Sequence, residues 1–249
     1  MQSLDGKVAL ITGASRGLGA TTAATLAAAG ARVVITHRDS ARDAERVLTG
    51  LPGNGHRIVQ ASVLESDALA RAARSVAETE GRLDILVNNA GVTKFVPHAD
   101  LDGLDDDTFD LIMRTNVRGA FACARAFRPL LAADGGGLIV NITSIAGRTA
   151  FGSNVAYCAS KAALDSITMS LARALAPEIR VVSVSPGLVD TELSRTWDPA
   201  VRQRQIDATP LGRLANPDEV GRAVLAVATT LDFTNGSIIT VDGGRPLGT

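Results

Sequence analysis

Seven short runs of apolar residues recur along the chain. Each run is rich in Val and Ile and is nearly continuous in hydrophobicity. That pattern is typical of parallel strands that are buried on both faces of a sheet. We therefore predict strands at residues 8–12, 32–36, 57–61, 84–88, 138–143, 180–185 and 237–241.

The segments between these runs are rich in Ala and Leu. Their apolar residues recur at spacings of three and four, the period of an amphipathic helix, most clearly over residues 20–30, 68–81 and 154–176. A repeated strand–helix–strand order implies right-handed crossovers. Because no Pro- or Ser-rich tract and no block of charge divides the chain, we predict one α/β domain over residues 1–249. Its fold should be a single-domain Rossmann fold, a doubly wound, seven-stranded parallel sheet with helices on both faces.

Two segments depart from this rhythm. Residues 92–110 are polar, acidic and interrupted by Pro97 and Gly103, and residues 188–216 form a long insertion before the next clear helical pattern. Long loops in compact domains are often functional. Both segments follow the carboxyl ends of predicted strands, where open α/β sheets bind ligands, so we expect them to form the substrate site.

Composition and charge exclude several classes of protein. Of 249 residues, 46% are hydrophobic, and 25 Lys and Arg nearly balance 26 Asp and Glu, so we expect no nucleic-acid partner. No apolar run reaches the roughly 18 residues of a membrane span, and the first residues lack a signal-peptide pattern. We therefore expect no membrane partner and a cytoplasmic location. Two cysteines, Cys123 and Cys158, are too few for a disulfide framework or a zinc site, and no metal is expected.

A glycine-rich turn follows the first predicted strand directly. In TGASRGLG, Gly13 permits a tight turn, Gly17 lets the backbone approach a pyrophosphate, and Gly19 allows close packing of helix and strand. The amino end of the next helix would offer free N–H groups to phosphate. A glycine turn without a ligand is the alternative, but the strand before it and the helix after it favour a dinucleotide site.

The end of the second strand bears on which nucleotide binds. NAD sites usually carry an acid there to bond the ribose 2′-OH. This strand ends in Thr36, His37 and Arg38, and the first acid is Asp39. Arg38, with Arg16 from the glycine turn, could clamp a 2′-phosphate, so NADP(H) is favoured over NAD(H). The alternative is that both arginines are solvated surface charges.

Further motifs occur in a fixed order: NNAG (88–91), Asn116 in RTNVRG, Ser144 in NITSIAG, YCASK (157–161) and SPG (185–187). Together with TGASRGLG (12–19), they make the whole chain resemble the short-chain dehydrogenase/reductase family, classical type, and within it the 3-oxoacyl-[acyl-carrier-protein] reductase-like group. The resemblance implies a usually tetrameric, NADPH-dependent oxidoreductase. It also implies a catalytic tetrad of Asn116, Ser144, Tyr157 and Lys161.

The chemistry of these side chains supports the implied roles. Tyr157 and Lys161 are spaced i and i+4, so they share one face of a helix. A nearby ammonium and an oxidised nicotinamide ring would lower the phenol pKa from about 10, so that Tyr157 could exchange a proton with a carbonyl oxygen. The hydroxyl of Ser144, at a strand end, could hydrogen-bond the same oxygen. The family role of Asn116 is to hold a water that links Lys161 to solvent.

Other positions match the family by alignment of motifs. Asn89 to Gly91 would line the adenosine ribose, and Pro186, Gly187, Val189 and Thr191 would shape the nicotinamide pocket. Where many members carry Asp–Val after the third strand, this chain has Ser62–Val63, which puts the adenine contact in doubt. The full cofactor set is Gly13, Ser15, Arg16, Gly17, Leu18, Gly19, His37, Arg38, Ser62, Val63, Asn89, Ala90, Gly91, Tyr157, Lys161, Pro186, Gly187, Val189 and Thr191.

The substrate and the assembly stay open at this point. We expect a small carbonyl or alcohol, with an acyl-carrier-linked 3-oxoacyl thioester as one candidate. The rival functions are an NAD-dependent alcohol or sugar dehydrogenase of the same fold and a non-catalytic dinucleotide-binding regulator. Predicted helices at 105–132 and 155–176 are apolar on more than one side, which agrees with a homotetramer or homodimer. The segment 192–213 contains Trp197 and four arginines, Arg195, Arg202, Arg204 and Arg213. These arginines either bind an anionic substrate or form a solvated helix face, and we favour the solvated face.

Overall fold

The computed structural model describes residues 3–133, 135–196 and 198–245. Its seven strands form one parallel sheet in the order β3-β2-β1-β4-β5-β6-β7. The predicted doubly wound sheet is therefore confirmed, and each strand begins and ends within one residue of its predicted bounds. These are β1 (Val8–Ile11), β2 (Arg32–His37), β3 (Arg57–Gln60), β4 (Ile85–Asn88), β5 (Gly137–Ile142), β6 (Ile179–Pro186) and β7 (Ile238–Val241).

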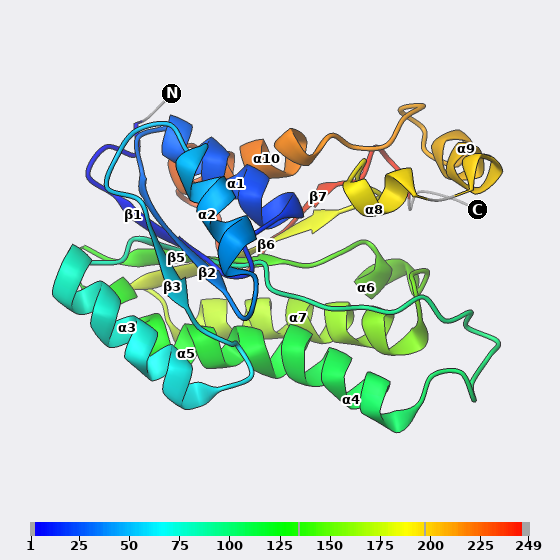
Figure 1. Cartoon of the computed structure of the whole chain (residues 1–249), viewed down its shortest axis with the longest axis horizontal. Helices are drawn as coiled ribbons and strands as arrows, with labels where there is room; N and C mark the ends of the chain where they lie inside the picture. Colours follow the sequence, from blue (N-terminus) through cyan, green and yellow to red (C-terminus); the bar gives the residue numbers. More distant parts are fainter. Residues whose placement is uncertain (1–2, 134, 197, 246–249) are drawn as a thin grey trace.

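Helices cover both faces of this sheet (Figure 1). One layer contains α1 (Gly17–Ala28), α2 (Ala41–Thr49) and α10 (Pro217–Thr229). The other contains α3 (Ser66–Glu80), α4 (Asp106–Met113), α5 (Ala120–Leu131) and α7 (Val155–Ala174). Three short helices lie at the edge where the strands end: α6 (Ala146–Thr149), α8 (Glu192–Arg195) and α9 (Pro199–Asp207).

Each layer has its own apolar core, because the strands bury side chains on both faces. Leu26 of α1 and Val224 of α10 pack with alternate residues of β1, β2 and β6 on one face. Leu69 of α3 and Phe127 of α5 pack with the other alternate residues on the opposite face. Phe127 is fully buried and is among the largest side chains of the core. Burial of an aromatic ring of this size is a large contribution to the hydrophobic free energy of folding.

Two predicted segments differ from the structure. The single helix expected over 105–132 is three segments, α4, a π-helix η1 (Arg114–Gly119) and α5. Helical periodicity could not reveal η1, because the spacing of apolar residues does not distinguish one π-helical turn from regular α-helix; Asn116, within η1, makes the tertiary contacts described below. The insertion at 188–216 is not wholly irregular but contains α8 and α9. Asp198 caps α9 by accepting from the Ala200 and Val201 amides, with Pro199 at the first helical position.

Some features are absent from the described ranges. Within them, no helix is both long enough and apolar enough to span a bilayer. The same residues contain no cluster of three or more His, Cys, Asp or Glu side chains suited to a metal ion. Cys123 and Cys158 are both buried free thiols.

Candidate active site

The glycine turn connects β1 to α1 with the conformation expected of it. Gly13 and Gly17 have φ of +63° and +57°, in the left-handed region that side chains disfavour. A Cβ on Gly19 would lie 2.5 Å from Asn89 Nδ2 and 2.7 Å from the Gly13 carbonyl oxygen. No described side chain caps the first amides of α1, and its first turn contains no acid. The turn therefore leaves a bare helix amino end with a positive dipole pointing at open space.

The end of β4 fixes this turn in place. Asn89 donates from Nδ2 to the carbonyl oxygens of Thr12 and Gly13, at 2.9 and 3.1 Å. The amides of Asn89 and Ala90 both donate to Thr12 Oγ1, at 3.0 Å. Thr12 was not among the predicted site residues, although its hydroxyl is the hub of this arrangement. The sequence feature that could have indicated this role is a Thr at the last position of the otherwise apolar predicted strand 8–12.

The residues predicted to bind the adenosine end lie around the ends of β2 and β3. His37 is buried, and its Nδ1 has no hydrogen-bond partner among the described residues. The exposed guanidinium of Arg38 forms an ion pair with the neighbouring Asp39. Ser62 is buried, with its hydroxyl accepting from the Leu64 amide at 3.3 Å, and Val63 packs against Gly119 of η1.

Tyr157 and Lys161 lie on consecutive turns of α7. Lys161 Nζ lies 5.7 Å from the centroid of the Tyr157 ring and donates to the Ile142 carbonyl oxygen at 2.8 Å. An ammonium has three protons, so two remain for other acceptors. Burial lowers the pKa of Lys161 from 10.5 to about 8, against the opposing effect of the Asp165 charge. The ammonium form therefore still predominates at neutral pH.

Burial dominates the pKa of Tyr157 in the protein without a cofactor. Burial raises it above 10, and this effect exceeds the lowering by a hydrogen bond from Ser144. A lowering of this pKa beside the lysine and an oxidised nicotinamide stays a prediction. In the protein alone the phenol is therefore held in its neutral, proton-donating form.

Asn116 lies in η1, and both the oxygen and the nitrogen of its side-chain amide form hydrogen bonds. Its Oδ1 accepts from the Val92 amide at 2.8 Å, while Nδ2 donates to the Val92 carbonyl oxygen and to Ser160 Oγ, both at 3.0 Å. Ser160 in turn donates to the Tyr157 carbonyl oxygen at 2.7 Å. The side chain thus fastens the loop after β4 to α7. The family role of Asn116, holding a water that links Lys161 to solvent, stays a prediction.

One cavity of about 230 Å³ brings together nine of the predicted residues, including three of the four predicted catalytic side chains. Ser144, Tyr157 and Lys161 lie on its wall together with the glycine-turn residue Leu18 and the loops after β4 and β6. The other predicted residues do not line it; they are Gly13, Ser15, Arg16, Gly17, Gly19, His37, Arg38, Ser62, Val63, Ala90, Asn116 and Thr191. The complete lining is Leu18, Asn89, Gly91, Val92, Thr93, Ile142, Thr143, Ser144, Tyr157, Lys161, Pro186, Gly187 and Val189.

Asn154 is a positioning residue that the motifs did not reveal. Its Oδ1 accepts from the Tyr157 amide at 2.7 Å and so caps α7 at its amino end. Its Nδ2 donates to the Lys94 carbonyl oxygen at 2.6 Å. An Asn directly before the first residue of a long helix is a capping signal that could have been recognised in the sequence.

The arginines of segment 192–213 are largely paired within the chain. Asp190 accepts from Arg195 at 3.4 Å and from Arg202 at 3.2 Å. Arg213 makes a two-pronged contact with Glu219, with both N–O distances 2.7 Å. These pairs agree with the interpretation that we favoured, a solvated face with local ion pairs. Trp197 lies outside the described residues.

Comparisons with known proteins agree with this site. A family model described as enoyl-(acyl carrier protein) reductase matches residues 13–245. A ketoacyl reductase assigned to the granaticin polyketide synthase of Streptomyces violaceoruber is 38% identical over 242 residues, 96% of each chain. The 3-oxoacyl-[acyl-carrier-protein] reductase FabG of Thermotoga maritima is 32% identical over 245 residues, 97% of this chain and 98% of that protein.

A solved structure gives the same result for the fold. The crystal structure of gox2181 superposes with a TM-score of 0.93 at 32% identity, covering 99% of this chain and 98% of that one. Likeness at this level shows that the two chains share the same overall fold. The chain belongs to the short-chain dehydrogenase/reductase family, whose oxidoreductases use a nicotinamide cofactor.

Proposed function

We propose that this protein is an NADP(H)-dependent reductase that interconverts a carbonyl and a secondary alcohol. The observation that carries the proposal is the single cavity in which Ser144, Tyr157 and Lys161 meet the end of the glycine turn. A proton donor, a hydroxyl and an ammonium next to a dinucleotide cradle are the groups that hydride chemistry on a carbonyl requires.

The glycine turn and its surroundings fit a dinucleotide. A Cβ on Gly17 would meet nothing within 4 Å, so the backbone there is open to a ligand, whereas Gly19 faces inward without room for any side chain. The bare amino end of α1 would hold the pyrophosphate. His37, with an unpartnered buried Nδ1, and Ser62 would lie toward the adenosine. Asn89 to Gly91, Pro186, Gly187, Val189 and Thr191 would extend the site to the nicotinamide.

The side chains of the cavity would divide the proton chemistry among them. The nicotinamide supplies or accepts the hydride when it is bound. Tyr157, kept neutral by burial, donates its proton to the carbonyl oxygen in the reducing direction. Ser144 donates a hydrogen bond to the same oxygen as negative charge develops there. The Lys161 ammonium stabilises the resulting phenolate and has protons left for ribose hydroxyls.

The choice between NADP(H) and NAD(H) depends on Arg38 and Arg16. Both guanidinium groups are exposed and could converge on a 2′-phosphate. One observation favours the NAD-dependent alternative, an alcohol or sugar dehydrogenase: Arg38 is paired with Asp39, whose carboxylate could take a ribose hydroxyl. The test is the affinity for NADPH and NADH of the protein and of Arg38→Asp. NADPH affinity that is indifferent to this substitution would refute the clamp.

The substrate class follows from the relatives only as a candidate. Two of them are named as reductases of ketoacyl or 3-oxoacyl groups, so a 3-oxoacyl thioester, linked to an acyl carrier or to coenzyme A, is the first substrate to assay. The experiment is NADPH and NADH oxidation with a panel of 3-oxoacyl thioesters, ketones and sugars. Cofactor binding without turnover of any panel member would favour the rival function, a non-catalytic dinucleotide-binding regulator.

We further propose a cytoplasmic homotetramer, with a homodimer as the smaller alternative. The outer faces of α4, α5 and α7 expose Phe109, Phe121 and Met169. Apolar side chains grouped on adjacent helices suggest a surface that a second copy covers. The mass in solution, measured by light scattering, tests this proposal. A monomer at micromolar concentration would refute it.

A further inference from the structure

Two exposed phenylalanines lie on loops next to the catalytic tyrosine. The Phe95 side chain is 78% exposed and that of Phe151 is 64% exposed. The chain has only six phenylalanines, and one, Phe127, is fully buried. We refer to residues 93–98 and 150–154 together as the aromatic lip.

Hydrogen bonds join the two halves of the aromatic lip into one unit. The Val96 amide donates to the Ser153 carbonyl oxygen at 2.9 Å, and Thr93 and Ser153 share a bond between their hydroxyls. Asn154 reaches the Lys94 carbonyl oxygen, and His98 Nε2 lies 3.2 Å from the Gly152 carbonyl oxygen. The loops are therefore fixed to each other, and the two rings are carried on a braced backbone.

The backbone before Phe151 is held in an unfavourable conformation. Ala150 has φ of +54°, and among the described residues it is the single non-glycine with positive φ. Such strain persists where the surrounding structure enforces it, and it is frequent at functional sites. The Phe151 amide donates to Thr149 Oγ1 at 3.2 Å, which fixes the turn. The backbone that carries Phe151 is thus held in place by this turn.

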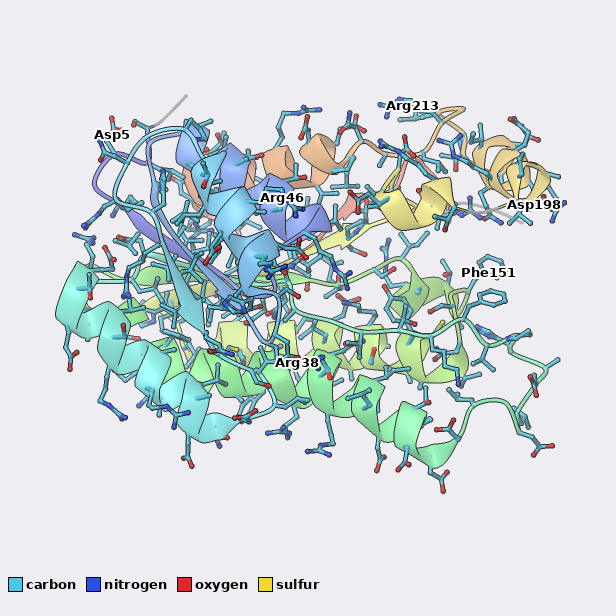
Figure 2. The ribbon with its side chains drawn as sticks, viewed as in Figure 1. Asp5, Arg38, Arg46, Phe151, Asp198 and Arg213 are labelled. Carbon is cyan, nitrogen blue, oxygen red and sulfur yellow. The ribbon has the colours of Figure 1, made fainter. Side chains whose placement is uncertain are left out.

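The aromatic lip is continuous with the catalytic cavity. Thr93 lines that cavity, and a Cβ placed on Gly152 would lie 3.3 Å from Tyr157 Cδ1. Phe151 is the residue before Gly152, so it lies beside the wall that carries the phenol, although its ring does not line the cavity itself. Figure 2 shows the labelled Phe151 projecting from the loop between α6 and α7, on the side of the molecule that carries α8 and α9.

Charge on the aromatic lip is sparse. Lys94 is its one residue with a permanent charge, and Nζ of this lysine lies 3.8 Å from Asp105 Oδ2. The nearby Arg148 has Asp242 within 3.7 Å. Both cations thus already have a carboxylate, so the entrance favours an uncharged, apolar group over a phosphate or a carboxylate.

We propose that the substrate carries a bulky apolar ring system or chain beyond its carbonyl, and that Phe95 and Phe151 bind this part. The inference rests on the proposed function, because it assigns the body of the substrate whose carbonyl meets Tyr157 and Ser144. Phe95 and Phe151 are thus specificity-determining residues, acting through apolar contact that raises the affinity for the apolar body.

The test compares a bicyclic ketone, 2-tetralone, with a small one, 2-butanone. The double variant Phe95→Ala/Phe151→Ala should lose at least tenfold in kcat/KM for 2-tetralone, mainly through KM, and less than twofold for 2-butanone. Phe95→Leu/Phe151→Leu should retain most of the activity on 2-tetralone. The matched control is Phe233→Ala. Phe233 is fully exposed in the loop before β7, at the amino ends of the strands, whereas the cavity lies at their carboxyl ends.

Binding provides a second readout that separates this inference from the proposed function. Calorimetric titration of 2-tetralone into the protein saturated with NADP⁺ should show at least tenfold weaker binding to the double Ala variant than to the wild type or Phe233→Ala. Equal binding, or an equal loss of activity on both ketones, would overturn the inference. If neither ketone is reduced but the difference in binding is found, the reductase proposal fails for these ketones and the apolar subsite stands.

Discussion

The pKa of Lys161 should depend on the charge of Asp165, which lies one helical turn further along α7. Both side chains are buried. Burial lowers the pKa of the lysine to about 8, and the Asp165 charge opposes that lowering. Replacing Asp165 by Asn removes the charge with almost no change in shape. The pKa of Lys161 should therefore fall further, toward neutral pH.

The size of this effect can be worked from the spacing. Side chains at i and i+4 of a helix lie roughly 6 Å apart. Two unit charges at that separation interact by about 3 kcal/mol at an effective dielectric constant of 20, equivalent to roughly two pKa units. Burial raises the pKa of Asp165 itself, and Arg148 acts on the same carboxylate. We therefore expect a measured shift of roughly one to two units.

The assay is the pH dependence of kcat/KM in the reducing direction. The ammonium is present below the pKa of Lys161 and is lost as pH rises through it, so the wild-type rate should fall near pH 8. In Asp165→Asn this alkaline limb should move to lower pH by one to two units. Asp67→Asn, which removes an exposed charge from α3, is the control and should leave the limb in place. A folded Asp165→Asn protein whose profile overlays the wild type would refute the reasoning.

Three further predictions test the site and the fold. Tyr157→Phe should lower kcat by about 10²- to 10⁴-fold, the usual contribution of a general acid, with NADPH affinity within twofold of the wild type; near-normal turnover would remove the tyrosine from the mechanism. Gly19→Val should abolish nucleotide binding measured by fluorescence titration, because its Cβ would lie 2.5 Å from Asn89 Nδ2, and retained affinity would count against the assigned cradle. Asp84→Ala should lower the free energy of unfolding in urea by about 2 kcal/mol, since Asp84 accepts from Lys7 at 2.9 Å and from the Val8 amide. Although burial raises the pKa of Asp84, these donors and Arg82 hold that pKa below 3.8. The stability that Asp84 contributes should therefore be present above pH 4 and be lost as pH falls through the folded-state pKa. Equal acid sensitivity of the wild type and the variant would contradict this prediction.

The strands of the sheet were predictable because each one can be identified from its own local pattern of apolar residues. A strand buried on both faces must be apolar at nearly every position, so its pattern in the sequence is short, dense and bounded. The glycine turn was predictable for a related reason, because Gly13 and Gly17 take positive φ that other residues disfavour. In both cases the local sequence already contains the physical constraint that the fold imposes.

Other parts of the site depend on contacts between distant segments. The side chain of Asn116 forms hydrogen bonds with Val92 and Ser160, which are 24 and 44 residues away in the chain. The raised pKa of Tyr157 arises from burial by several elements, which no spacing of motifs records. The pairing of Arg38 with Asp39 also lay beyond the motif, because adjacent residues in sequence need not have side chains that meet.

The π-helix η1 gives two neighbouring helices independent orientations. Adding or removing one residue rotates the rest of an α-helix by about 100°. Helix α4 packs on α7, whereas α5, directly after η1, packs on α3 and the sheet. A one-residue deletion within η1 that restored regular α-helix would turn Phe127 away from its core. It would also break the two hydrogen bonds between the Asn116 side chain and the Val92 backbone. Insertions and deletions in this segment should therefore be tolerated far less than at the surface turns, since the register of η1 places both Phe127 in the core and Asn116 against the loop after β4.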